Sequence, residues 1–246
     1  MKKTIAIVDS RISEKAERKL MLSGFTVVKL PPYSKLSTPV ASHTDMLIHR
    51  IGKNLISYAD YCEEASYVFF DLSLYIVPSG YSMSFADDEV GSEYPNDVGL
   101  NALSINGKLF CRSDSLSKML LDYAKSSSLE IVNTNQGYPA CTVLKLTEQS
   151  AITADLGMAK ALEDAGIRVT LIENGDILLP PYEYGFIGGC GGVYNGKLYL
   201  FGDPALHRSC NKILTAAHDE GLEVVSLDTT LLADLGGIIF IECDIK

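Results

Sequence analysis

Several patterns that often reveal chemistry are missing from this sequence of 246 residues. Its six cysteines are scattered and include no C-x-x-C pair. A chain of this length, with 47% hydrophobic residues, builds a core without needing disulfide bonds. We therefore predict reduced thiols and a cytoplasmic location. The cysteines are Cys62, Cys111, Cys141, Cys190, Cys210 and Cys243.

Long apolar runs are also absent. No window reaches the roughly 18 apolar residues that a membrane-spanning helix needs. The apolar run from Ile5 to Val8 is too short for the hydrophobic region of a signal peptide, because Asp9 follows it directly. We interpret this run as the first β-strand, and we predict no association with a membrane.

Positive charge is scarce: the sequence has 21 Lys and Arg residues and 31 Asp and Glu residues, so its net charge is -10. Affinity for a phosphate backbone comes mainly from clustered Lys and Arg, so we predict no nucleic-acid partner. An acidic protein would instead attract a small cationic molecule. The oligomeric state is left open by the sequence.

A phosphate-binding loop is missing as well. The glycine-rich segment GFIGGCGGVYNGK (185–197) lacks the G-x-x-x-x-G-K-[ST] spacing and leads into a hairpin, not a helix. We therefore predict no cofactor. These glycines are expected to let strands approach closely, with Cys190 lining a central channel as a substrate-binding residue; a second nucleophile or a resolving thiol is the alternative role for Cys190.

What the sequence does contain is an internal repeat. INGKLF (105–110) recurs as YNGKLYLF (194–201), and each has the Asn-Gly pair that a type I′ hairpin requires at its turn. RIGKNLI (50–56) is a less regular third copy. Three β-hairpins are therefore predicted.

Helices and further strands follow these hairpins. Apolar residues recur at helical spacing before Gly166 and Gly221, where left-handed helix ends are expected, and short β-branched strands follow Gly24, Gly166 and Gly221. The predicted unit is strand, hairpin, strand, helix and strand. The apolar positions are Leu156, Ala159 and Leu162 in one helix, and Leu206, Cys210, Ile213, Leu214 and Ala217 in another.

Alignment of the predicted units brings five chemically active positions into register, at intervals of 44 to 52 residues. Five units fill residues 1–246 as a single α/β domain. Each unit has an apolar sheet face that it cannot bury alone, so the units are expected to pack around a shared axis with helices outside. The aligned positions would then meet at a central channel; they are Asp45, Asp97, Cys141, Cys190 and Asp234.

Two short motifs accompany this repeat. HTDMLIH (43–49) places His43 and Asp45 at the start of an apolar run that we interpret as a buried strand, and GYPACTV (137–143) carries Cys141 after a glycine-containing turn. Polar residues in such a run are costly unless they are paired or functional. The motifs and the repeat together resemble the pentein fold of the guanidino-group-modifying enzymes, which include deiminases, dimethylarginine dimethylaminohydrolases and amidinotransferases.

The resemblance implies a five-fold pseudo-symmetric α/β propeller of ββαβ units. It also implies a Cys-dependent hydrolase or transferase for a guanidine- or amidine-bearing small molecule. Cys141 would be the nucleophile, His43 the general acid/base and the cation that lowers the pKa of Cys141, and Asp45 a residue that orients the imidazole or binds substrate. Asp97, with Asp234 as second choice, would hold the planar cation.

Other interpretations remain open at this stage. The superfamily also contains non-catalytic members, so the channel of a non-catalytic scaffold is the alternative function. We predict no metal, although His43, Asp45 and the channel cysteines form a conceivable metal site. His207 and His218 are expected to face solvent. Tyr33 and Tyr182, from two Leu-Pro-Pro-Tyr segments, are expected to wall the channel opening, and loop 87–97 to lie at its rim.

Overall fold

In the computed structural model, which describes residues 2–244, five three-stranded sheets share one plan. In each sheet the first strand pairs antiparallel with the second, and the second pairs parallel with the third. The sheets are β17-β1-β2 (Ile239–Asp244, Lys2–Asp9, Phe25–Leu30), β3-β4-β5 (His49–Ile51, Asn54–Tyr58, Ser82–Ala86), β6-β7-β8 (Leu103–Ile105, Lys108–Cys111, Glu130–Asn133), β9-β10-β11 (Val143–Lys145, Ser150–Thr153, Arg168–Leu171) and β13-β14-β15 (Gly191–Tyr194, Lys197–Leu200, Glu223–Ser226).

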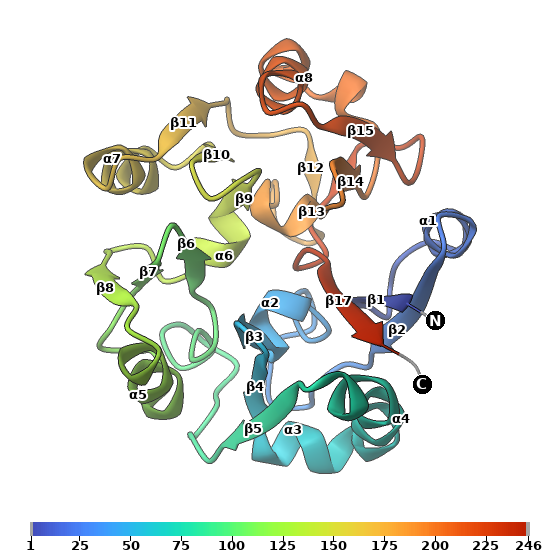
Figure 1. Ribbon diagram of the computed structural model, residues 1–246. Coiled ribbons are helices and arrows are strands. Elements are labelled where there is room, and N and C mark those ends of the chain that lie inside the picture. The colour runs from blue at the N-terminus through green and yellow to red at the C-terminus, as the bar shows by residue number, and fades with distance from the viewer. Residues whose placement is uncertain (1, 245–246) are drawn as a thin grey trace.

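Helices make the crossover between the second and third strand of every sheet, as parallel pairing requires. Figure 1 shows the five sheets around the centre of the molecule with these helices at the periphery. The crossover helices are α1 (Glu14–Leu22), α3 (Ala59–Glu64) with α4 (Ser66–Ile76), α5 (Lys118–Ser126), α7 (Leu156–Asp164) and α8 (Cys210–Asp219). Shorter elements are α2 (Thr44–Leu47), α6 (Pro139–Thr142), η1 (Val77–Ser79), η2 (Gly188–Cys190), η3 (Pro204–Leu206), and the pair β12 (Ile177–Leu178) and β16 (Leu232–Ala233).

The strand that completes the first sheet comes from the other end of the chain. β17 pairs antiparallel with β1 over six residue pairs, so the first and last strands share one sheet. Figure 1 accordingly places the two termini close together. The chain thus returns to its starting point, and the centre is surrounded by sheets from the whole sequence. Among residues 2–244 no helix is long and apolar enough to cross a membrane.

The predicted hairpins are confirmed. Asn106 and Gly107 have φ values of 52° and 69°, and Asn195 and Gly196 have 48° and 73°, the positive angles that a type I′ turn needs. The third, less regular hairpin joins β3 to β4 with Gly52 at positive φ. The two Asn-Gly pairs and Gly52 therefore set the register between β6 and β7, between β13 and β14, and between β3 and β4.

The helix predictions are confirmed only in part in α7 and α8. Ala159 and Leu162 are buried in α7, but Leu156 is 72% exposed and Met158 is buried instead. The Asp155 side chain caps the first turn of α7 by accepting a hydrogen bond from the Met158 amide. In the other segment the helix begins at Cys210, so Leu206 lies outside it, 49% exposed in η3. A 3₁₀ turn after Asp203 takes the place of the predicted first helical turn.

The motif HTDMLIH does not form a strand, which corrects our prediction. His43 is the residue before α2, the amides of Leu47 and Ile48 bond back to the carbonyls of His43 and Thr44, and β3 starts only at His49. The polar residues therefore occupy a short helical turn at the centre of the molecule. Cys141 lies in the equivalent turn, α6, directly before β9.

Two further predictions are wrong. His207 is 2% exposed, and its Nδ1 accepts a hydrogen bond from the Ser209 amide at 2.9 Å; His218, by contrast, is exposed as predicted. Tyr33 is 1% exposed and packs on Tyr58 and Tyr61 in the core, so it does not wall an opening.

Candidate functional site

His43, Asp45 and Cys141 meet at the centre of the fold. One ligand-type atom from each side chain lies within 4.8 Å of the other two, although His43 and Cys141 are 98 residues apart in the sequence. His43 precedes α2, Asp45 lies in α2, and Cys141 lies in α6. The inner turns that precede β3 and β9 thus bring a thiol, an imidazole and a carboxyl together.

The Cys141 thiol is held by an asparagine that the sequence did not single out. The Asn101 side-chain amide donates a hydrogen bond to the Cys141 Sγ at 3.1 Å, and its oxygen accepts from the Ala140 amide at 3.0 Å. Asn101 is itself 1% exposed. Nothing in the local sequence marks this residue, because its partner is 40 residues away.

The protonation state of Cys141 follows from its surroundings. Burial raises the pKa of the thiol well above its usual value, and the carboxyl groups of Asp45 and Asp234 raise it further. The Asn101 amide opposes this rise because it donates a hydrogen bond to the sulfur. In the free protein the thiol is therefore protonated at neutral pH.

His43 is a neutral imidazole at neutral pH. The side chain is fully buried, and within the described range 2–244 neither ring nitrogen has a hydrogen-bond partner. Burial, and secondarily the positive charge of Arg11, lower its pKa to about 3. The sequence interpretation that an imidazolium lowers the pKa of Cys141 is therefore wrong for the free protein. The neutral ring is able to accept a proton.

Two carboxyl groups at the site have unused hydrogen-bonding capacity. Both carboxyl oxygens of Asp45 are buried without a well-formed hydrogen bond from residues 2–244. Burial raises the pKa of Asp45 to about 6, and the neighbouring Cys141 thiol and Asn101 amide oppose this rise. Asp97 is 4% exposed; its Oδ2 accepts a hydrogen bond from the Tyr138 hydroxyl at 2.8 Å, while Oδ1 has no partner. Burial raises the pKa of Asp97 as well. Buried acceptors of this kind gain most from a ligand that donates N–H bonds.

Asp234 differs because its oxygens are occupied. Oδ2 accepts from the Phe186 amide at 2.8 Å and Oδ1 from the Gly236 amide at 3.3 Å. Oδ1 also lies 3.7 Å from His43 Nδ1. Burial, with a contribution from Asp45, raises the pKa of Asp234 to about 8. Asp234 therefore joins two loops and stands next to the imidazole.

The raised pKa of Asp234 has a consequence for stability. A carboxyl whose folded pKa is about 8 and whose usual value is 3.8 stabilises the fold below about pH 4, and this contribution is lost as the pH rises toward 8. In Asp234→Asn the amide cannot titrate. We expect the variant to be less stable than the natural protein at pH 5, and the difference to shrink at pH 8.

Urea denaturation midpoints at the two pH values measure this difference. The same substitution at Asp71, exposed on α4, controls for the general effect of removing one negative charge. A difference that stays constant or grows between pH 5 and pH 8 contradicts the assignment of a protonated Asp234.

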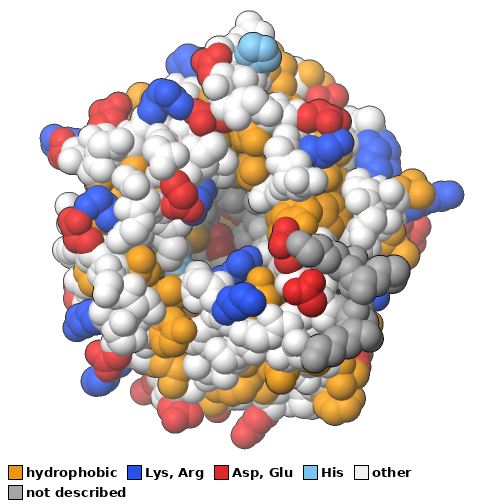
Figure 2. All heavy atoms as spheres, in the orientation of Figure 1, with side chains coloured by type: hydrophobic (Ala, Val, Ile, Leu, Met, Phe, Trp, Pro, Cys, Tyr) orange, Lys and Arg blue, Asp and Glu red, His pale blue; other side chains and the backbone are white. Residues whose placement is uncertain are grey.

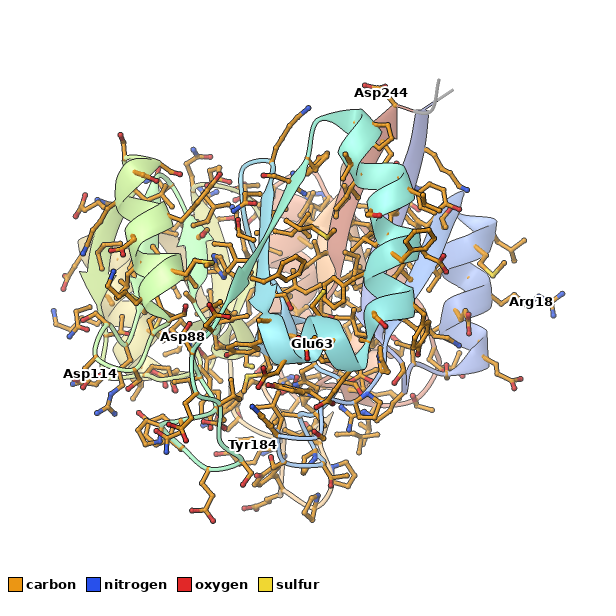
Figure 3. The ribbon with its side chains drawn as sticks, turned by 90° about the horizontal axis from the view of Figure 1, so that it is seen from below. Arg18, Glu63, Asp88, Asp114, Tyr184 and Asp244 are labelled. Atoms are coloured by element: carbon orange, nitrogen blue, oxygen red, sulfur yellow. The ribbon has the colours of Figure 1, made fainter. Side chains whose placement is uncertain are left out.

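Two cavities approach the site from opposite faces. The first has a volume of about 380 Å³ and reaches Cys141, His43, Asp97 and Asp234. The second, of about 450 Å³, is lined by Asp45 and by residues of the inner strands β9, β13 and β17. Figure 2 shows the molecule hollowed at the centre of one face. Figure 3 shows Tyr184, which lines the first cavity, on loops at the end opposite Asp244.

Cys190 does not line the first cavity, which corrects its prediction as a substrate-binding residue. It is fully buried in a hydrophobic cluster, and its thiol donates a hydrogen bond to the Phe186 carbonyl at 3.3 Å. Burial raises its pKa well above the usual value. Neighbouring glycines do let backbones approach closely, as predicted: a Cβ at Gly188 or Gly191 would overlap backbone carbonyl groups.

A metal ion is sterically conceivable at the trio of His43, Asp45 and Cys141, whose nitrogen, oxygen and sulfur donors are of the types that zinc prefers. His49 is not part of this group: it lies in β3, and its Nε2 is hydrogen-bonded to the Ser104 hydroxyl at 3.0 Å. The same three side chains are also those that nucleophilic chemistry at a cationic carbon requires.

Solved structures of guanidino-group-modifying enzymes resemble this fold. Dimethylarginine dimethylaminohydrolase from Pseudomonas aeruginosa, solved as a cysteine-to-serine mutant with citrulline, has a TM-score of 0.55 at 13% identity, covering 93% of both chains. An inosamine-phosphate amidinotransferase from Streptomyces griseus has a TM-score of 0.54 at 16% identity, over 89% of this chain and 74% of that one. The agmatine deiminase of C. jejuni has a TM-score of 0.51 at 10% identity, over 91% and 76%.

The chain therefore has the mixed α/β pentein fold of these enzymes. By sequence it belongs to a particular family, described as a family of unknown function (DUF6873), whose model matches residues 7–239. No curated protein matches the sequence. The likeness to the solved enzymes concerns the fold, so the chemistry has to be argued from this chain's own residues.

Proposed function

We propose that this protein is a Cys-dependent enzyme that hydrolyses a guanidine- or amidine-bearing small molecule or transfers its amidino group. The observation that carries the proposal is the meeting of Cys141, His43 and Asp45 within 4.8 Å, with His43 and Cys141 lining the first cavity. The five units would act as a five-fold pseudo-symmetric propeller whose inner turns supply the catalytic groups. The ligand would be a small cationic molecule.

The proposed first step forms a covalent intermediate. The neutral imidazole of His43 takes the proton of the Cys141 thiol, and the sulfur attacks the central carbon of the bound guanidinium. The tetrahedral adduct then breaks its C–N bond, and His43 returns the proton to the departing amine. What remains on Cys141 is a thiouronium group.

The second step releases this group. His43 takes a proton from water, or from an acceptor amine, as that nucleophile attacks the thiouronium carbon. The C–S bond then breaks, and Cys141 recovers its proton. Water as nucleophile gives a urea-type product, whereas an amine gives a new guanidine. Asp97, which lines the first cavity with Cys141, would hold the planar cation through charge-assisted N–H bonds, and Asp45, which lies beside the thiol, would orient the imidazole or contact the cation.

The raised pKa of Cys141 supports a role for the substrate itself in activating the thiol. Carboxyl groups that disfavour a thiolate in the free protein favour a bound cation, and the cation in turn favours the thiolate. A neutral reagent brings no such charge. The proposal thus predicts that Cys141 reacts selectively with cationic electrophiles.

A matched pair of alkylating agents tests this. Chloroacetamidine carries an amidinium, and chloroacetamide is its neutral counterpart of similar shape. We expect chloroacetamidine to modify Cys141 at least about tenfold faster, since each unit by which a cation lowers the pKa gives about tenfold more thiolate. Peptide mapping by mass spectrometry after timed exposure measures the rate at each cysteine.

Cys62 and Cys210 provide internal controls because both are partly exposed. They should react with both reagents at rates that differ little. Equal and slow modification of Cys141 by the two reagents contradicts the enzyme proposal and favours a non-catalytic scaffold. The same protein incubated with guanidines should release a urea-type product or form a new guanidine, which mass spectrometry also detects.

A further inference from the structure

One wall of the first cavity contains none of the proposed catalytic residues. It comes from the segment that follows β12, and it brings Leu179, Tyr182, Glu183, Tyr184 and Phe186 to the cavity. Glu183 and Tyr182 are exposed, so they stand at the rim, whereas His43 and Cys141 are buried at the inner end. A ligand whose reactive carbon lies at Cys141 would place its far end against this segment.

The cavity lining, as far as the structure describes it, includes no Lys or Arg. Asp97 and Glu183 are its acidic residues, and Asp234 also lines it, with a carboxyl that is protonated at neutral pH because its pKa is raised to about 8. His43 also lines it, but as a neutral ring. A carboxylate on the far part of a ligand would therefore enter without a cationic partner, at a cost of several kcal/mol for a desolvated, unpaired charge.

Arg11, whose positive charge acts on His43 and Asp234, is already engaged. Its guanidinium donates to both carboxyl oxygens of Asp9, at 3.0 Å and 3.1 Å from Nε and 2.5 Å from Nη2, and to the Thr38 carbonyl at 3.2 Å. Asp9 is fully buried, so releasing Arg11 would leave a buried unpaired carboxylate. Arg11 is not among the residues that line the cavity.

Two observations point to a ligand with two cationic ends. At the inner end, Asp97 lines the cavity and is 4% exposed, and its Oδ1 is buried without a hydrogen-bond partner among residues 2–244. At the rim, the Glu183 carboxylate is flanked in sequence by Tyr182 and Tyr184, and aromatic faces attract organic cations. A guanidinium suits the first position, and an ammonium suits the second.

We propose that this site selects guanidines that carry no carboxylate and end in an amine, joined by an alkyl chain, and that Glu183 is a specificity-determining residue. This inference rests on the proposed function for the identity of the inner group. The inference adds that the segment from Leu179 to Phe186 contacts the far end of the substrate and so determines which substrates bind. An α-amino acid with a guanidinium side chain is rejected because its carboxylate has no partner.

Protection of Cys141 from chloroacetamidine tests the proposal. The competitors are agmatine (guanidinium and amine), arginine (guanidinium, amine and carboxylate) and n-butylguanidine (guanidinium alone). We expect agmatine to give half protection at a concentration at least about tenfold below that of arginine, with n-butylguanidine between them. Calorimetric titration of the same three compounds into the unmodified protein gives a readout that does not depend on labelling.

The Glu183→Gln variant separates the two ends of the ligand. It should raise the half-protecting concentration of agmatine toward that of n-butylguanidine and leave the value for n-butylguanidine unchanged. Glu163→Gln, at an exposed position of α7, is the matched control and should change neither. Because Glu183 is exposed, the substitution leaves the core intact.

The outcomes distinguish this inference from the proposed function. Arginine that protects or binds as well as agmatine overturns the inference while the enzyme proposal stands. Calorimetric binding of agmatine in preference to arginine, without selective labelling of Cys141, supports the inference and contradicts the enzyme proposal. No binding and no labelling overturn both, and a Glu183→Gln effect equal for agmatine and n-butylguanidine overturns the role of Glu183.

Discussion

Replacing Cys141 with serine should abolish modification by chloroacetamidine at this position and reduce any turnover of guanidines by at least about a thousandfold. A hydroxyl is far harder to ionise than a thiol, and loss of a nucleophile is among the largest single effects known in enzymes. The fold should survive, because serine is smaller and can still accept the hydrogen bond that the Asn101 amide donates. Intact-mass labelling and product analysis measure the two effects, and circular dichroism checks the fold.

Cys190→Ser is the matched control for this experiment. Cys190 is also fully buried, and a serine hydroxyl can make the same bond to the Phe186 carbonyl. This variant should retain selective labelling of Cys141, with at most a moderate loss of stability. If Cys141→Ser turns over guanidines at the natural rate, or if Cys190→Ser removes the labelling, the assignment of the nucleophile is wrong.

Gly188→Ala should destabilise the protein by about 2–3 kcal/mol and disturb the site. A Cβ at this position would lie 2.5 Å from the Cys141 carbonyl oxygen and 2.7 Å from that of Val143, and would also overlap the Ala140 carbonyl. All of these atoms are backbone, so they can move only if α6 and the start of β9 move. We therefore expect a lower urea midpoint together with slower labelling of Cys141 by chloroacetamidine.

Gly157→Ala is the control for the general effect of adding a methyl group at a glycine. Gly157 lies in the first turn of α7, where alanine favours the helix, and the added Cβ would meet only the Asp155 side chain, at 3.2 Å. Its stability should stay within about 1 kcal/mol of the natural protein. Equal urea midpoints for Gly188→Ala and the natural protein would contradict the close packing of η2 against α6.

The sequence predicted those parts of the fold that depend on neighbours in the chain. The Asn-Gly pairs at 106–107 and 195–196 determine their own turns through backbone conformation, and the apolar spacing predicted the helix in which Ala159 and Leu162 are buried, although it also placed the exposed Leu156 on the buried face. Because these signals recur with a period, they also predicted the repeated unit of strand, hairpin, strand, helix and strand. Where one signal was ambiguous, as in HTDMLIH, a short helical turn was mistaken for a strand.

The candidate site was only partly predictable, because the direction of each side chain depends on packing that the repeat does not specify. The aligned inner turns brought His43, Asp45 and Cys141 to one place, which the repeat implied. The same alignment placed Cys190 in the channel, but the glycines around it allow η2 to pack so closely that this thiol turns into the core. Alignment fixes which turn a residue occupies and leaves the direction of its side chain open.

The sequence by itself determined the repeated units, their hairpins and helices, and the types of side chain available at the centre, because these depend on local conformational preference and on periodicity. Only the tertiary structure decided that the Asn101 amide bonds to Cys141 and that the His43 ring is neutral. It also decided that Asp97 lines a cavity whose described lining residues include no Lys or Arg. Hydrogen-bond partners and the energetic cost of burying a charge depend on atoms from distant parts of the chain, and those meet only when the whole chain has folded.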